Sequence, residues 1–331
     1  MSNYLSGKTR GDYIFDIVPF PTRVEWNITD YCNLSCAYCL NSSNPHSAKG
    51  LVTEQCLRIA DILSDGGVAY VTLIGGEPFA RNDIFTIMDR LKHNRIIMEV
   101  VTNGILLDER TVEMLARLNP NVRTVQLSLH LPERVDHYKR VIKRLVENGI
   151  DVVTFIVVTR KNIHSMPTLF ESILKAEPTY FALGGVCGAG RASGVYYEQN
   201  SVSFGEITEL VMALERIKSK TTAKTHIGYK DRRMLAEYLI KGYNLHIMAH
   251  VCRAGIREFF IDGNGRATPC HFMEGDEAER YKTATLTQYA SLSDVWWSPE
   301  FEFFRRDYMG RENARFVDSC SGCRHFKTGD C

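Results

Sequence analysis

Three cysteines near the N-terminus have the spacing that most directly indicates chemistry. Cys32, Cys36 and Cys39 lie within eight residues of one another, directly after the first predicted strand. Three thiolates this close together can wrap one iron–sulfur cluster. A cube of four irons then keeps one iron without a protein ligand, just as a catalytic zinc site keeps one position open. A structural zinc site is the alternative, but it needs a fourth ligand, and no His or Cys follows until His46.

A glycine-rich segment follows the second predicted strand. Gly75-Gly76-Glu77-Pro78 lies at the carboxyl end of that strand, where parallel α/β folds place their functional loops. The two glycines let the backbone approach a ligand closely, and Glu77 supplies a hydrogen-bond acceptor. A glycine turn beside an acid is also a common ordinary turn. The segment alone therefore does not define a site.

A second group of cysteines lies in the C-terminal part of the chain: Cys252, Cys270, Cys320 and Cys323. Cys252 and Cys270 flank a predicted hairpin formed by 258–261 and 266–269, and a CxxC pair supplies the other two thiols. Four thiolates occupy the protein-ligand positions of four irons, which predicts a closed auxiliary cluster. A zinc ion held by four cysteines is the alternative, because CxxC pairs serve both metals.

Taken together, the CxxxCxxC motif, the aromatic Tyr38 before its last cysteine, and the GGEP segment resemble the radical S-adenosylmethionine (SAM) superfamily. The resemblance implies that the amino and carboxylate groups of SAM chelate the open iron. It further implies that an electron from the cluster splits SAM into methionine and a 5′-deoxyadenosyl radical. Tyr38, Gly75, Gly76, Glu77 and Pro78 are the SAM-binding residues that it implies.

The C-terminal cysteines, with Gly265 and Cys270 in the form GxxxxC, resemble the SPASM/Twitch extension of radical SAM enzymes. A complete SPASM domain continues past its CxxC with several more cysteines, whereas only Cys331 follows here. We therefore expect one auxiliary 4Fe–4S cluster, as in the Twitch arrangement. Cys331 is interpreted as a spare thiol, with a replacement ligand as the alternative.

Further candidate residues lie at other strand ends. By the family pattern, Asn103 and Ser128 are expected near the SAM carboxylate and ribose, although an Asn-Gly pair is also a natural turn and a serine also caps. His130 is either part of this site or a satisfied polar group, since relatives often have an acid there. Cys187, beyond the sixth strand, is a candidate hydrogen donor or a small buried residue. Cys56 is expected to be buried inside a helix.

Strands and helices alternate between residues 24 and 185, which indicates βα units and a parallel sheet. The predicted strands are 24–28, 70–74, 96–102, 122–129, 152–158 and 179–183, and helices are predicted at 53–63, 109–118, 134–146 and 165–175. A closed eight-unit barrel needs about 250 residues, so a partial (β/α)6 barrel is expected. The predicted organisation is an N-terminal extension (1–23), the barrel (24–200), a helical connection (201–250, with helices near 204–217 and 231–240) and an auxiliary domain (251–331).

Composition excludes several function classes. The chain has 331 residues, a formal net charge of +1 and 44% hydrophobic residues, so we expect neither a nucleic-acid nor a membrane partner. The first residues have no apolar signal segment, and a cytoplasmic location is expected. Ten cysteines in that reducing compartment favour metal chemistry over disulfides.

The resulting hypothesis is an enzyme that abstracts a hydrogen atom from a C–H bond, with a peptide as the expected substrate. Oxidation or epimerisation of a sugar or aminocyclitol is the alternative, and a non-enzymatic iron–sulfur electron carrier or sensor is a more remote one. An external reductant such as flavodoxin or ferredoxin is expected. The segment before Val24 is too short for a fused leader-binding domain, which predicts a separate recognition protein or direct peptide binding.

Overall fold

The structure is a computed structural model that describes residues 17–230, 253–272 and 278–309. These residues divide into two compact units. The first unit takes 17–34, 43–98, 253–272 and 278–309, and the second takes 35–42 and 99–230. Strand β3 (Ile97–Thr102) begins in the first unit and ends in the second.

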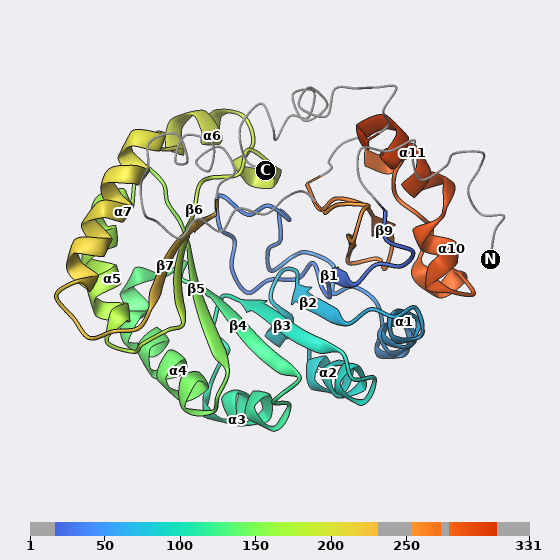
Figure 1. Ribbon diagram of the computed structural model, residues 1–331, viewed down its shortest axis with the longest axis horizontal. Coiled ribbons are helices and arrows are strands. Elements are labelled where there is room, and N and C mark those ends of the chain that lie inside the picture. Colours follow the sequence, from blue (N-terminus) through green and yellow to red (C-terminus); the bar gives the residue numbers. More distant parts are fainter. Residues whose placement is uncertain (1–16, 231–252, 273–277, 310–331) are drawn as a thin grey trace. The chain divides into compact units, whose positions relative to one another are not determined.

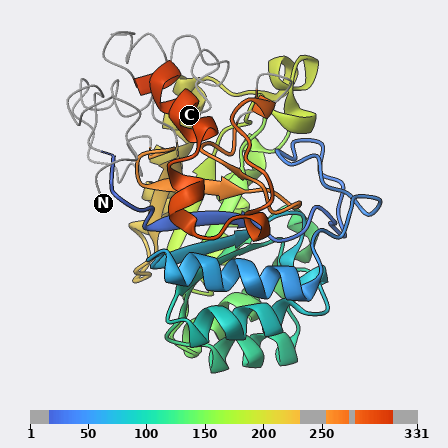
Figure 2. The same cartoon turned by 90° about the vertical axis from the view of Figure 1, so that its right-hand side faces the viewer.

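Four strands of the first unit form a sheet in the order β2-β1-β8-β9. They are β1 (Arg23–Asn27), β2 (Tyr70–Ile74), β8 (Glu258–Ile261) and β9 (Ala267–Thr268). Strand β1 runs parallel to both of its neighbours, and β9 runs antiparallel to β8. Figure 2 shows β8, in orange, beside β1, in blue. The C-terminal hairpin therefore extends the sheet that begins the chain.

Helices cover one face of this sheet (Figure 1). The helices of the first unit are α1 (Thr53–Asp65), η2 (Pro78–Ala80), α2 (Ile84–His93), η6 (Leu286–Gln288), α10 (Leu292–Trp296) and α11 (Pro299–Met309). On β1, Val24 and Trp26 are buried, and on α1 the buried residues Cys56, Ile59 and Leu63 recur at helical spacing. The apolar face of α1 therefore packs into the core. The predicted burial of Cys56 is confirmed.

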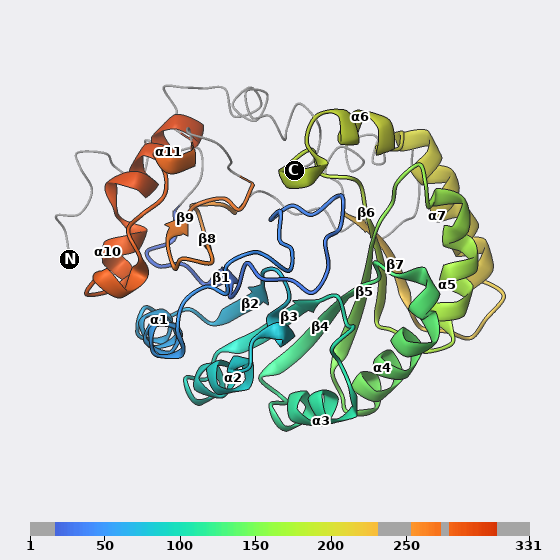
Figure 3. The ribbon, with the colours of Figure 1, turned by 180° about the vertical axis from the view of Figure 1, so that it is seen from behind.

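The second unit has four parallel strands in the order β4-β5-β6-β7. They are β4 (Val122–Ser128), β5 (Asp151–Val157), β6 (Tyr180–Gly184) and β7 (His226–Lys230). The helices of this unit are α3 (Glu109–Arg117), η3 (Pro132–Arg134), α4 (Val135–Glu147), η4 (Ile163–Ser165), α5 (Met166–Leu174), η5 (Gly190–Ala192), α6 (Val195–Asn200) and α7 (Phe204–Lys218). Figure 3 shows α4, α5 and α7 along the outer side of these strands. On β5, every second residue is buried, namely Val152, Thr154 and Ile156.

The expected parallel-sheet α/β fold is confirmed, and all six predicted strands and the hairpin are present. The expectation of a helical connection at 201–250 needs correction. Helix α7 is where it was predicted, but residues 226–230 form strand β7, which pairs in parallel with β6. The helix predicted at 231–240 lies outside the described residues. The domain limits 24–200, 201–250 and 251–331 stay a prediction.

Candidate functional site

The cysteine motif spans the loop between β1 and α1, and its first cysteine belongs to the first unit. Cys32 is buried, and its amide donates to the carbonyl of Asn44 at 3.2 Å. The amide of Leu34 donates to Cys32 Sγ at 3.4 Å. Hydrogen bonds to a cluster sulfur stabilise its negative charge and tune the reduction potential of the cluster. The surroundings of Cys32 therefore suit a thiolate ligand.

Cys36 and Cys39 belong to the second unit, where both are partly exposed. The amide of Cys39 donates to the carbonyl of Cys36 at 3.2 Å, so the two residues share one turn. Arg191 makes two hydrogen bonds to this turn. Its Nε donates to the Cys36 carbonyl at 2.8 Å, and its amide donates to the Cys39 carbonyl at 3.1 Å. The loop after β6 thus fixes the backbone of both cysteines.

Gly190 lets that loop approach closely. Its φ is +57°, and a Cβ there would lie 2.7 Å from the carbonyl carbon of Leu40 and still closer to the carbonyl oxygens of Cys39 and Leu40. Only glycine combines this dihedral angle with such an approach. Cys187, the predicted hydrogen donor, is partly buried in the same loop, three residues before Gly190.

The GGEP loop packs against the backbone that leads into Cys32. The amide of Gly76 donates to the Thr29 carbonyl at 2.6 Å, and the amide of Glu77 donates to the Tyr31 carbonyl at 2.8 Å. A Cβ on Gly76 would lie 2.8 Å from the Asp30 carbonyl oxygen and nearer still to that of Tyr31. The glycine predicted to allow close approach is therefore required by the protein's own backbone.

Glu77 is completely buried, with 0% of its surface exposed. It is the N-cap of η2, and its Oε1 accepts a hydrogen bond from the amide of Phe79 at 3.1 Å. Pro78 follows at the first helical position, where its missing N–H loses no hydrogen bond. The carboxylate is thus held in one orientation at the carboxyl end of β2.

The predicted residues at the ends of β3 and β4 are both buried, Asn103 with 5% and Ser128 with 8% of their surface exposed. Asn103 Oδ1 accepts from the amide of Ile105 at 3.0 Å, so its side chain stabilises the turn that contains Gly104. His137 Nε2 lies 2.8 Å from the Gly104 carbonyl oxygen and ties this turn to α4. The turn role considered for Asn103 is therefore present, and the cofactor roles of Asn103 and Ser128 stay predictions.

His130 makes a polar contact with Tyr38 of the cysteine motif, within the second unit. Tyr38 Oη lies 3.0 Å from His130 Nδ1, and the two ring centroids are 5.6 Å apart. Burial lowers the pKa of His130 to about 4, so the imidazole is neutral at pH 7. Burial also raises the pKa of Tyr38 above its usual range. A neutral phenol and a neutral imidazole therefore share this hydrogen bond.

In the C-terminal part of the chain, the structure describes Cys270 and its surroundings. His271 stacks on Phe260 with centroids 4.1 Å apart, and its Nδ1 lies 3.5 Å from Glu25 Oε2. Gly265 of the GxxxxC pattern has φ +75°, and a Cβ there would lie 2.7 Å from Leu51 Cδ1. The other predicted cysteines, Cys252, Cys320, Cys323 and Cys331, lie outside the described residues.

Two arginines that contact these loops were not singled out from the sequence. Arg191 binds the Cys36–Cys39 turn, and Arg81 binds the carbonyls of Ile28 and Leu51, near the two ends of the loop that contains the cysteine motif. Most of the acceptors of both arginines are backbone carbonyls, which have no sequence signature. The only available signal was their position directly after a glycine-rich motif.

Comparisons with known proteins place this geometry in a family. The model of the radical SAM superfamily matches residues 26–173, and that of an iron–sulfur cluster-binding domain, SPASM, matches residues 252–324. The mycofactocin maturase MftC of Mycolicibacterium smegmatis is 31% identical over 322 residues, which cover 92% of this chain and 76% of that protein. The chain therefore belongs to the radical SAM superfamily.

Two further proteins, one curated relative and one solved structure, are similar to this chain. The PqqA peptide cyclase of Granulibacter bethesdensis is 26% identical over 90% of this chain and 80% of that protein. The crystal structure of Streptococcus suis SuiB bound to precursor peptide SuiA is 20% identical and superposes with a TM-score of 0.70 over 88% of this chain and 68% of that one. At that identity, the likeness to SuiB shows a common fold.

Family membership establishes the class of the protein and its cofactors. The chain is a radical SAM enzyme that uses SAM and a 4Fe–4S cluster, with auxiliary iron–sulfur binding in its SPASM domain. The residues present fit these groups, because the motif offers three thiols, an amide that donates to Cys32 Sγ, and a buried acid on a glycine loop. Within the described ranges, no helix is both long enough and apolar enough to cross a membrane.

Proposed function

We propose that this enzyme modifies a peptide at a C–H bond. The observation that carries the proposal is the match along nearly the whole chain to a protein named as a peptide cyclase, supported by a common fold with SuiB, which was solved with a precursor peptide. When bound, the cluster supplies the electron that splits SAM, and the resulting 5′-deoxyadenosyl radical removes a hydrogen atom from the substrate. The protein contributes position and the exclusion of water.

The residues are assigned as follows. Cys32, Cys36 and Cys39 hold the SAM-binding cluster, and Cys252, Cys270, Cys320 and Cys323 hold one auxiliary cluster. The GGEP backbone and the buried Glu77 accept the amino group of SAM, because a carboxylate fixed by the Phe79 amide needs no reorganisation to receive it. Tyr38, Asn103 and Ser128 are proposed as further SAM-binding residues. The residue ranges 24–200 and 251–331 are proposed as the two functional domains.

Two protein partners are part of the proposal. An external one-electron donor such as flavodoxin or ferredoxin reduces the cluster, because the reaction consumes an electron that the polypeptide cannot supply. The peptide is bound directly or through a separate recognition protein.

The test begins with a search for short reading frames beside the gene for this chain, and a candidate peptide found there is synthesised. Anaerobically reconstituted and reduced enzyme is incubated with SAM and that peptide, and the products are analysed by mass spectrometry. The expected result is 5′-deoxyadenosine together with a peptide that has lost a pair of hydrogen atoms or has changed configuration. An unchanged peptide, with an aminocyclitol or sugar oxidised in its place, would show that the substrate class is wrong.

Epimerisation is a second candidate outcome, favoured by the position of Cys187 in the loop that docks on the Cys36–Cys39 turn. Its S–H bond would give a hydrogen atom to the substrate radical. The thiyl radical left behind would take an electron from the external reductant and a proton from solvent. In deuterated water, an epimerised product should then carry one deuterium, and Cys187→Ala should lose that product. A product unaffected by Cys187→Ala excludes the donor role.

A further inference from the structure

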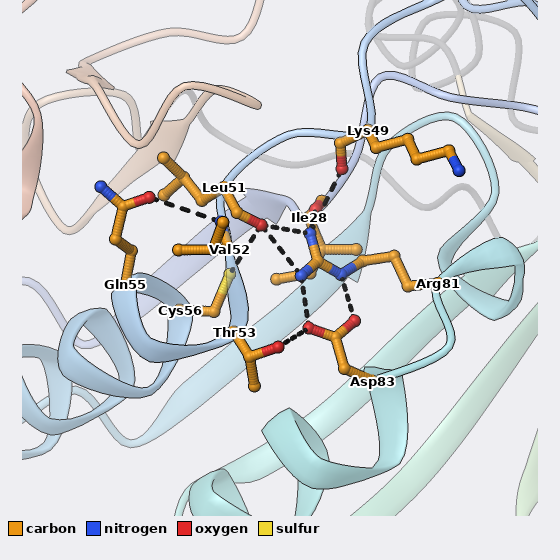
Figure 4. Close-up of polar contacts among 9 residues, drawn as sticks. All are labelled: Ile28, Lys49, Leu51, Val52, Thr53, Gln55, Cys56, Arg81 and Asp83. Carbon is orange, nitrogen blue, oxygen red and sulfur yellow. Dashed lines mark hydrogen bonds and ion pairs between the residues drawn. The ribbon is translucent and has the colours of Figure 1, made fainter.

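A buried arginine follows the GGEP segment, three residues after Pro78. Arg81 follows η2, and only 7% of its side chain is exposed. Its guanidinium donates to the carbonyls of Ile28 at 2.9 Å, Leu51 at 3.0 Å and Lys49 at 3.3 Å (Figure 4). The same group makes a bidentate pair with Asp83, from Nε to Oδ1 at 2.9 Å and from NH2 to Oδ2 at 2.7 Å.

The acceptors come from separate segments of the first unit. Ile28 ends the β1 segment and lies four residues before Cys32, and Leu51 lies just before α1. Arg81 itself lies four residues after Glu77. One guanidinium therefore ties the end of the GGEP segment to the two ends of the loop that contains the cysteine motif.

Asp83 and Thr53 keep the guanidinium in place. Thr53 Oγ1 donates to Asp83 Oδ2 at 2.6 Å (Figure 4). Burial opposes the charge of Asp83, but the hydrogen bonds from Arg81 and Thr53 outweigh it and lower the pKa of the carboxyl, which is ionised at pH 7. The planar Arg81 guanidinium has one favoured orientation, because it is bound by a carboxylate and several carbonyls at once. A lysine ammonium cannot reproduce this arrangement of hydrogen bonds.

We infer that Arg81, oriented by Asp83, is a positioning residue for SAM. By joining the GGEP segment to the exit of β1, it sets the place of Glu77 relative to the loop of Cys32. The inference rests on the proposed role of the GGEP loop in binding SAM. The hydrogen bonds described for the Arg81 guanidinium go to Asp83 and to backbone carbonyls and to none of the three motif cysteines, so its loss should weaken SAM binding while the cluster ligands remain available.

The experiment compares Arg81→Lys, Arg81→Met and Asp83→Asn with Arg90→Lys as a matched control. Arg90 also pairs with a carboxylate, Asp61 at 3.3 Å, but on the surface, where both side chains are about 40% exposed and such pairs contribute little. Each protein is reconstituted anaerobically. Its iron content, its SAM dissociation constant from the change that SAM causes in the spectrum of the reduced cluster, and the KM and kcat for 5′-deoxyadenosine formation are measured.

The expected result is unchanged iron and a dissociation constant for SAM raised about tenfold or more in Arg81→Met, with a smaller rise in Arg81→Lys and in Asp83→Asn and no change in Arg90→Lys. A protein with both Arg81→Met and Asp83→Asn should bind SAM about as weakly as Arg81→Met alone, because Asp83 acts through Arg81. Iron-loaded Arg81 variants with wild-type affinity for SAM would overturn the inference. So would an equal loss of iron and affinity in Arg81→Lys and Asp83→Asn, which would indicate a general folding role. A wild-type protein that makes no 5′-deoxyadenosine would instead refute the proposed function.

Discussion

Replacing Gly190 with alanine tests whether the loop after β6 shapes the cysteine turn. Gly190 adopts φ +57° against the carbonyl groups of Cys39 and Leu40. Gly194, in the same segment, adopts φ +64° but has no atom within 4 Å of the position that a Cβ would take. The two glycines therefore share a positive φ and differ in the steric contact, which makes Gly194→Ala the control for the backbone cost.

The expected loss of stability has two parts, the cost of the backbone conformation and the cost of the steric contact. A positive φ in a sparsely populated backbone region costs an alanine about 1–3 kcal/mol at either position. At Gly190 the new Cβ would lie well inside the 3.0 Å that real Cβ atoms keep from their neighbours. The neighbours are backbone atoms, so one of the loops must move, which adds about 1–3 kcal/mol. Gly190→Ala should therefore destabilise the protein by about 2–6 kcal/mol and Gly194→Ala by about 1–3 kcal/mol.

The assay measures thermal unfolding and iron content of both variants, purified and reconstituted anaerobically. Gly190→Ala is expected to unfold at the lower temperature and to lose iron selectively, from about eight toward about four per chain, because the turn that carries Cys36 and Cys39 must shift. Gly194→Ala is expected to keep its iron. Equal stability and full iron in both variants would refute the reasoning.

Three further predictions concern other contacts. Tyr38→Phe and His130→Phe should each raise the KM for SAM, and the double variant should show a coupling of about 0.5–1.5 kcal/mol; simple additivity would contradict a functional pair. Replacing Cys320 and Cys323 with Ala should remove the auxiliary cluster and abolish substrate turnover while SAM cleavage survives; zinc and only about four irons in the wild type would contradict this. Arg305→Ala should lower the free energy of unfolding by about 3 kcal/mol. The buried guanidinium carbon lies 4.5 Å from the ring centroid of Trp296, and Nε donates to the Gly255 carbonyl at 2.9 Å. An unchanged denaturant midpoint would contradict this prediction.

The sequence was most informative where one physical signal dominates. The strands of the parallel sheet are rich in β-branched residues, and on β5 four of the seven residues are valine or isoleucine and every second residue is buried. Three cysteines in eight residues have few interpretations, and the GGEP segment added a second independent motif. Local patterns therefore sufficed for the fold class and for the chemistry.

Strand β7 and the neighbours of β8 needed information that periodicity does not contain. The β7 sequence His-Ile-Gly-Tyr-Lys has one β-branched residue and polar ends, so it does not stand out as a strand. The hairpin of β8 and β9 was predicted, but its parallel pairing with β1 joins residues more than two hundred positions apart. Packing decides which strand pairs with a given edge of the sheet.

Long-range polar contacts were also beyond sequence reasoning. His130 was left open between a site residue and a satisfied polar group, and the structure gives it Tyr38 as a partner ninety-two positions away. Arg81 has backbone acceptors on two segments, and any residue supplies a carbonyl. Such contacts become visible only when the fold brings the segments together.

The most direct test of the account is SAM cleavage by the anaerobically reconstituted and reduced protein, measured as 5′-deoxyadenosine, in the wild type and in a variant with Cys32, Cys36 and Cys39 replaced by Ala. The wild type should contain about eight irons and form 5′-deoxyadenosine. The variant should retain about four irons and form none, because its remaining cluster has no open iron. Formation of 5′-deoxyadenosine by the variant, or none by the iron-loaded wild type, would contradict the assignment of the SAM-cleaving cluster to these three cysteines.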